Sequence, residues 1–204
     1  DRTQAGHPQQ YFEKYQADNL YWRINQDIAL LGMCGNSDSN MIINQILCKT
    51  QSGGEKVKAN DTYNKNRIDL LLIPYYNRIL NLCFYIERMP NSLFITGLEK
   101  LAADANIIGY QTSDYNQTRW RLYGGLLELS IAAALGRCGS IKGVQTLIEY
   151  LKDVHSDFRF FANQELNAIL KKDMKFDYNK WTNLINTKKG FLNKTTPFSK
   201  EIEL

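Results

Sequence analysis

The sequence predicts an all-α protein, an irregular α-solenoid of about four stacked antiparallel helix pairs. The segment Leu-Gly-x-Cys-Gly occurs twice, at residues 31–35 and 135–139, and a polar turn and an apolar helical stretch follow each copy. Apolar residues recur at the three- and four-residue spacing of a buried helical face. No stretch keeps the period-two alternation of a half-buried strand. Together these observations favour helices throughout.

The first helix pair is predicted over residues 14–50, after a loosely ordered leader at residues 1–13. Asp18 is a candidate N-cap of its first helix, and Gly35 is expected to end that helix by adopting a positive φ. The buried face of the first helix should contain Leu20, Ile24, Ile28 and Leu31. The cap of the second helix should be Ser37, Asp38 or Ser39. The apolar stripe of the second helix should consist of Ile42, Ile43, Ile46 and Leu47.

The second pair is predicted over residues 63–105. Before it, residues 50–61 are typical of a linker, because they contain Gly53-Gly54 and no apolar periodicity. A long helix should run from about residue 64 to residue 88, and Pro74 should either start it or kink it. Pro90 then breaks the chain, and residues 106–117 form a second loop. The helix between them should bury Phe94, Leu98 and Leu101.

The third and fourth pairs are predicted over residues 118–154 and 155–187, and a polar tail over residues 188–204. Gly139 should end the helix of residues 118–138. Within that helix, Gly124-Gly125 is expected to permit close contact with a neighbouring backbone, because glycine is otherwise unfavourable there. Asp177 can cap the last helix, and Trp181 should seal the end of the stack. The helix after Gly139 should bury Val144, Leu147, Ile148 and Leu151.

The spacing of the turns agrees with stacked pairs. They centre near residues 36, 90, 140 and 174, around the roughly 40–47-residue period of two-helix repeats. A single pair cannot bury its apolar face alone, and stacking buries it. Residues 134–170, ALGRCGSIKGVQTLIEYLKDVHSDFRFFANQELNAIL, resemble a HEAT repeat followed by the first helix of the next one. Residues 28–47 are a weaker match and residues 71–103 a degenerate one.

A second resemblance concerns the overall layout. Trp22-Arg23, Trp120-Arg121, GVQTLIEYLKDV at 143–154 and KFDYNKW at 175–181 resemble the helical C-terminal region of some bacterial FAD-dependent oxidoreductases. This resemblance implies the non-catalytic end of a larger flavoenzyme. Since no G-x-G-x-x-G follows a strand, we expect no flavin or other cofactor in this segment. The chain starts at Asp1 without a charged-then-apolar leader, so we expect a processed form or a fragment of unknown compartment.

The cysteines do not suggest a metal site. They are far apart in the sequence, and together with His7 and His155 they lack the spacing of zinc ligands. Burial as small apolar side chains is the expectation for Cys34, Cys48, Cys83 and Cys138. Cys34 and Cys138 are expected to point into the same layer of the stack, and disulfide pairing is left open.

His155 is the other candidate for chemistry, because it lies between Asp153 and Asp157 at a helix boundary. Acid–base catalysis needs an oriented partner and a substrate position, and neither is visible in the sequence. Capping or surface duty is favoured for His155, and turn and cap duty for the two aspartates. No catalytic residue is therefore predicted.

Twelve tyrosines and three tryptophans are more informative, because several concentrate near residues 106–123. Aromatic side chains with a polar tip are enriched at binding surfaces. The candidate interaction surface is Tyr110, Tyr115, Trp120 and Tyr123. Packing between unequal helix pairs is the alternative role for these side chains.

Composition limits the classes of function. The 25 basic and 21 acidic residues give a net charge of +4 and are interspersed, which favours a mixed solvated surface. No run of 18 apolar residues exists, so we expect a soluble protein without a membrane span. The leading hypothesis is a non-catalytic binding or scaffolding module that contacts a protein partner or a catalytic domain of its own longer chain.

Two alternatives remain open at this point. One is an accessory domain of a flavin-dependent oxidoreductase, which rests on the resemblance above. The minor one is nucleic-acid binding, although the pI of about 8.8 is below that of a strongly basic domain. The basic residues that would contact phosphates are Lys56, Lys58, Lys65, Arg67, Arg119, Arg121 and Arg137.

Overall fold

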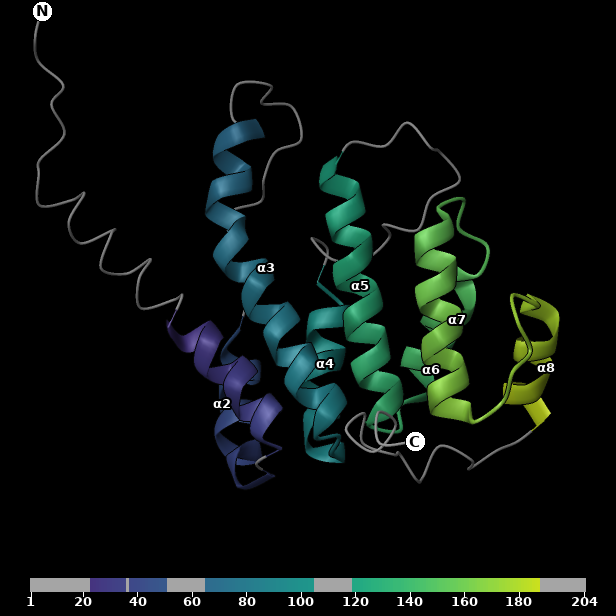
Figure 1. Ribbon diagram of the computed structural model, residues 1–204, viewed down its shortest axis with the longest axis horizontal. Helices are drawn as coiled ribbons and strands as arrows, with labels where there is room; N and C mark the ends of the chain where they lie inside the picture. The colour runs from purple at the N-terminus through teal and green to yellow at the C-terminus, as the bar shows by residue number, and fades with distance from the viewer. Residues whose placement is uncertain (1–22, 36, 51–64, 105–118, 188–204) are drawn as a thin grey trace, which may run out of the picture.

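The computed structural model describes residues 23–35, 37–50, 65–104 and 119–187, with side chains except at 65–76 and 119–123. Every regular element in these ranges is a helix and none is a strand, so the all-α prediction is confirmed. Figure 1 shows the helices side by side along the long axis, from residues 23–34 at one end to α8 at the other. The finer prediction, a HEAT-like solenoid of four units, stays a proposal. The helices are 23–34, α2 (Asn40–Lys49), α3 (Lys65–Arg88), α4 (Ile95–Ala102), α5 (Arg119–Arg137), α6 (Ile141–Tyr150), α7 (Ser156–Leu170) and α8 (Tyr178–Thr187), with 3-10 turns η1 (Ser37–Ser39) and η2 (Ser92–Phe94).

The central element is α5, which packs against α3, α4, α6 and α7. From residue 124 to residue 138 its side chains are buried except at Leu126 and Glu128. A helix that is apolar on all sides must be covered on all sides, and the run of residues 129–136 contains only Leu, Ser, Ile, Ala and Gly. The sequence of α5 therefore explains its position in the middle of the molecule.

Two hydrophobic cores lie on opposite sides of α5. The first joins helix 23–34, α2, α3 and α4 to the α5 side chains Leu127, Ile131 and Leu135. The second joins α6, α7 and α8 to Leu129 and Ala132. Residues of α5 that are three or four apart share a side, which gives each core its own stripe of the same helix.

The two Leu-Gly-x-Cys-Gly segments both end a helix with a left-handed glycine, as predicted. Gly35 has φ +64° and Gly139 has φ +93°. At the second segment the N–H of Gly139 donates to Gly136 O at 3.0 Å, and the N–H of Ser140 donates to Leu135 O at 2.9 Å. These two bonds define a Schellman motif, which satisfies carbonyls that the helix end leaves free. At the first segment the equivalent bond runs from Gly35 N to Gly32 O at 3.3 Å.

Glycines also allow close helix crossings. A Cβ on Gly143 would lie 2.4 Å from Ala132 O and 2.6 Å from Gly136 N, so α6 rests directly on the backbone of α5. A Cβ on Gly32 would lie 3.1 Å from the Cα of Tyr85 in α3. Gly125 differs from the prediction, because its neighbour is the ring of Phe158, 2.5 Å from the Cβ position, and not a backbone.

The C-terminal end agrees with the sequence in detail. Asp177 caps α8 by accepting a hydrogen bond from the N–H of Lys180 at 3.0 Å. This bond is the first cause of the lowered pKa of the Asp177 carboxyl. Trp181 is fully buried and its indole N–H donates to Lys175 O at 2.9 Å.

In the middle of the chain α3 begins at Lys65, so Pro74 lies inside that helix and does not start it.

Candidate functional site

Helix 23–34 has one apolar stripe that faces the first core and a second that faces outward. Ile28 is buried in the first core and Leu31 packs against that core. On the outward side, Leu30 is 54% exposed and Met33 is 64% exposed. Because the two stripes lie on opposite sides of one helix, the outward side chains cannot reach the first core.

α2 repeats this arrangement. Ile43 and Leu47 are buried in the first core, whereas Met41 is 64% and Ile42 59% exposed. The prediction that Ile42 belongs to the buried stripe is therefore wrong. Three successive apolar residues at 41–43 span about 200° of a helix, which is more than one buried stripe covers. We call the outward set the N-terminal apolar face; its residues are Leu30, Met33, Met41 and Ile42.

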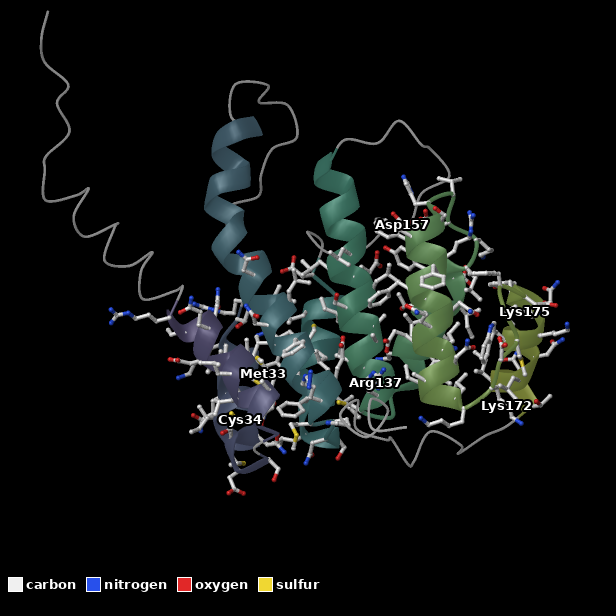
Figure 2. The ribbon with its side chains drawn as sticks, viewed as in Figure 1. Met33, Cys34, Arg137, Asp157, Lys172 and Lys175 are labelled. Carbon is white, nitrogen blue, oxygen red and sulfur yellow. The ribbon has the colours of Figure 1, made fainter. Side chains whose placement is uncertain are left out.

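The opposite end of the molecule has no such face among its described residues. The exposed side chains of α8 are all polar: Asn179, Lys180, Asn183, Asn186 and Thr187. Its single fully buried residue is Trp181. Figure 2 labels Met33 and Cys34 toward one end of the row of helices and Lys172 and Lys175 toward the other. Helix 23–34 and α2 thus expose large apolar side chains among charged ones, whereas the exposed side chains of α8 are polar.

The cysteines divide between these environments. Cys83 and Cys138 are buried, as predicted, but Cys34 and Cys48 are exposed, so the prediction fails for those two. Cys34 and Cys138 therefore do not share a buried layer. Burial raises the pKa of the Cys138 thiol to about 12 and that of Cys83 well above its usual value. All four cysteines are free.

The predicted aromatic surface is mostly beyond the described residues. Tyr110 and Tyr115 lie outside them. Trp120 and Tyr123 fall in α5, but only the backbone is described there. That interaction surface therefore stays a prediction.

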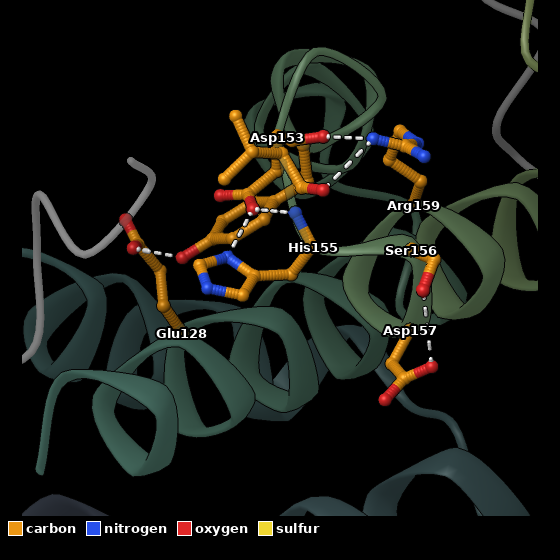
Figure 3. A network of polar contacts seen from close by, with 8 residues as sticks. Glu128, Asp153, His155, Ser156, Asp157 and Arg159 are labelled. Atoms are coloured by element: carbon orange, nitrogen blue, oxygen red, sulfur yellow. Dashed lines mark hydrogen bonds and ion pairs between the residues drawn. The ribbon is translucent and has the colours of Figure 1, made fainter. Parts of the chain in front are cut away.

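The turn between α6 and α7 holds a set of polar contacts, drawn in Figure 3. The Asp153 side chain is buried and accepts the backbone N–H of His155 at 2.8 Å. Its Oδ1 also lies 2.7 Å from Nδ1 of His155. Arg159 donates to the carbonyl of Asp153 at 2.6 Å and to that of Val154 at 3.1 Å. Each contact fixes the turn, which agrees with the turn duty expected of Asp153.

The neighbouring side chains complete this cluster. The Tyr150 hydroxyl donates to Glu128 Oε2 at 2.6 Å, and the Phe158 ring meets both Tyr150 and His155. Asp157 is exposed and contacts Ser156, so it does not form a carboxylate pair with Asp153. A histidine oriented by a carboxylate is a component of acid–base sites. Here the oriented ring packs on the Phe158 ring, and the capping or surface duty expected of His155 stays a prediction.

A second charged cluster lies inside the molecule, where α3, α5 and α7 meet. Arg137 is 2% exposed; its Nε lies 2.9 Å from Glu165 Oε2, and its Nη2 lies 3.3 Å from Oε1. Burial is the largest cause that raises the pKa of the Glu87 carboxyl to about 8, and the negative charge of Glu165 adds to it. The positive charges of Arg137 and Arg88 act in the opposite direction. Arg137 is therefore not available to phosphates, which corrects its place among the predicted nucleic-acid contacts.

The remaining six basic residues of that prediction have no described side chains. Among the described side chains, no three His, Cys, Asp or Glu lie close enough to hold a metal ion. No helix in the described ranges is long and apolar enough to cross a bilayer. Comparison with protein families, with characterised proteins and with solved structures finds no match for this chain.

Proposed function

We propose that this chain is a non-catalytic helical-repeat module that binds protein through its N-terminal apolar face. The observation that carries the proposal is the exposure of Leu30, Met33, Met41 and Ile42, each more than half exposed, on two successive helices. Large apolar side chains grouped on a surface mark interaction sites, whereas single ones are ordinary.

The remaining exposed apolar side chains support this choice of face. Among the described side chains they occur one to an element: Leu93 on η2, Leu126 on α5, Ile141 on α6, Phe160 on α7 and Phe176 before α8. Two of the four side chains of the N-terminal apolar face are methionines, which are flexible and polarizable and suit adaptable binding surfaces.

The test is site-specific photo-crosslinking in cells that make the protein. A photoreactive amino acid at position 33 or 42 should give a cross-linked species of one mass, identified by mass spectrometry as a protein. The matched control places the same amino acid at position 160, where Phe160 is 55% exposed on α7. If positions 33 and 42 cross-link no more than position 160 does, this face is not a binding surface.

The flavoenzyme and nucleic-acid hypotheses remain alternatives from the sequence alone. The same cross-linking experiment separates the first from the leading proposal. If the species captured at position 33 is a catalytic domain encoded in the same reading frame, the module serves an enzyme.

A further inference from the structure

We propose that the connection between α7 and α8 binds the anionic surface of a lipid bilayer. Residues 171–177 form this connection, which contains three exposed lysines and one exposed aromatic side chain: Lys171, Lys172, Lys175 and Phe176. We call these four residues the basic turn. It lies toward the end of the row of helices opposite helix 23–34, so the inference does not depend on the N-terminal apolar face (Figure 1).

The backbone of the basic turn indicates that its lysine side chains are used. Lys171 has φ +51° and Lys175 has φ +53°, and they are the two non-glycine residues with positive φ in the described part of the chain. The left-handed conformation is unfavourable for a lysine and easy for a glycine. Because such strain is concentrated at functional sites, lysines at both positions point to a role for their ammonium groups.

The turn is also held in place by the rest of the protein. The buried Trp181 donates its indole N–H to the carbonyl of Lys175 at 2.9 Å. The N–H of Lys175 donates to Oδ1 of Asp173 at 3.0 Å. Both polar groups of the Lys175 backbone therefore have partners, while its side chain and that of Phe176 are exposed. A turn that is already fixed loses little conformational entropy when it binds.

Positive charge dominates this part of the surface. Between residues 171 and 180 the exposed charged side chains are four lysines and the carboxylate of Asp173. The fourth lysine, Lys180, pairs with the partly exposed Asp177 at 3.2 Å. By contrast, helix 23–34, η1 and α2 expose two charged residues of each sign. The charge of the basic turn is therefore complementary to an anionic partner.

The aromatic side chain favours a bilayer among anionic partners. Phe176 is 50% exposed and directly follows Lys175. Such a side chain can enter the boundary between head groups and acyl chains while the neighbouring lysines contact lipid phosphates. Single-stranded nucleic acid is typically held in a positively charged groove with several stacking aromatic rings. The basic turn is one short connection with one exposed ring, which suits a flat surface better.

The test is co-sedimentation of the full 204-residue chain with vesicles of phosphatidylcholine, either alone or mixed with phosphatidylserine. We expect binding to the mixed vesicles only, and this binding should weaken as added salt screens the lysines. The variant Lys171→Gln/Lys172→Gln/Lys175→Gln should lower the partition coefficient at least roughly tenfold, because each lysine near such a surface contributes roughly fivefold.

A matched variant controls for net charge. Lys49→Gln/Lys100→Gln/Lys142→Gln removes the same charge from exposed positions on other helices and should bind like the wild type. Circular dichroism should show the same helix content in both variants. A wild-type chain that does not bind the mixed vesicles overturns the inference, and so does an equal loss of binding in the two variants.

Fluorescence tests the part played by Phe176. Relative to wild type, Phe176→Trp should add an emission that shifts to the blue on the mixed vesicles, because the indole leaves water. Phe160→Trp, at a position that is similarly exposed on α7, should show no such shift. Equal shifts at the two positions would contradict insertion of the basic turn. Tighter binding to a single-stranded oligonucleotide than to the vesicles would overturn the inference in favour of a nucleic-acid site.

Discussion

The two Leu-Gly-x-Cys-Gly segments have the same backbone and opposite surroundings. Both end a helix with a glycine at positive φ and with the same backbone bond three residues back. The variable position is Met33 in the first segment and Arg137 in the second. The apolar Met33 is 64% exposed, and the charged Arg137 is 2% exposed. Local sequence therefore determines the corner, and the neighbouring helices determine which side chains are buried.

The reason for the difference lies in the number of neighbours. Helix 23–34 lies at one end of the row of described helices and buries only one stripe, whereas α5 has a core on each side. Arg137 can be buried because Glu165 on α7 binds it through two hydrogen bonds. No core of the described residues covers the outward side of Met33, and this leaves it on the N-terminal apolar face.

The largest expected difference in the free energy of unfolding is between variants at the two variable positions, Met33 and Arg137. Arg137→Ala should lower the free energy of unfolding by about 3–5 kcal/mol, because it leaves the carboxylate of Glu165 in the interior without its partner. Met33→Ala should change it by less than about 0.5 kcal/mol, since an exposed side chain loses little packing. Urea unfolding of both variants measures the difference. Equal effects at the two positions would contradict the burial described here.

The next effect concerns the helix crossing beside each segment. Gly143→Ala should cost about 2–3 kcal/mol, because its Cβ would overlap the backbone of α5 at Ala132 and Gly136. Gly32→Ala should cost about 1 kcal/mol or less, because its Cβ would be 3.1 Å from Tyr85 Cα and a shift of a few tenths of an ångström relieves it. Thermal unfolding of the two variants compares the crossings. Gly143→Ala should have the lower melting temperature, and the opposite order would contradict this account.

The buried charged groups near the second Leu-Gly-x-Cys-Gly segment predict that the free energy of unfolding depends on pH. The pKa of Glu87 is raised from 4.5 to about 8, so between these values the folded chain holds a proton that the unfolded chain releases. Wild-type stability should therefore fall as the pH rises from about 5 to 8, through this group. Glu87→Gln should lie close to wild type near pH 5 and exceed it near pH 8 by about 3–4 kcal/mol, at about 1.4 kcal/mol for each pKa unit. Parallel stability curves for the two proteins would show that Glu87 does not titrate in this range.

The smallest effect is expected to be the same in both segments. Gly35→Ala and Gly139→Ala should each cost about 1 kcal/mol, because both place a side chain in the left-handed region. At Gly35 the nearest atom to an added Cβ would be Met89 Sδ at 4.0 Å, so no close contact adds to the strain there. Chemical denaturation should give values that agree within about 0.5 kcal/mol. A clear difference would mean that the two corners are not equivalent in backbone.

Much of the secondary structure could be predicted, because it depends on local signals. Gly139, Asp177 and the apolar stripe at Val144, Leu147 and Ile148 marked the helices that the structure contains. The exposure of Met33 and Cys34 and the burial of Arg137 could not be predicted, because they depend on helices distant in sequence. For Ile42 a signal was present, since residues 41–43 are too apolar for one stripe.

The most direct test of the contrast between the two segments is the reactivity of their cysteines. In native protein a maleimide should label Cys34 roughly 100-fold faster than Cys138, whose thiol is buried and has a pKa raised to about 12. Peptide mass spectrometry assigns each site, and in denaturant the two rates should become equal. Similar labelling rates for Cys34 and Cys138 in the native protein would contradict an open first segment and a buried second one.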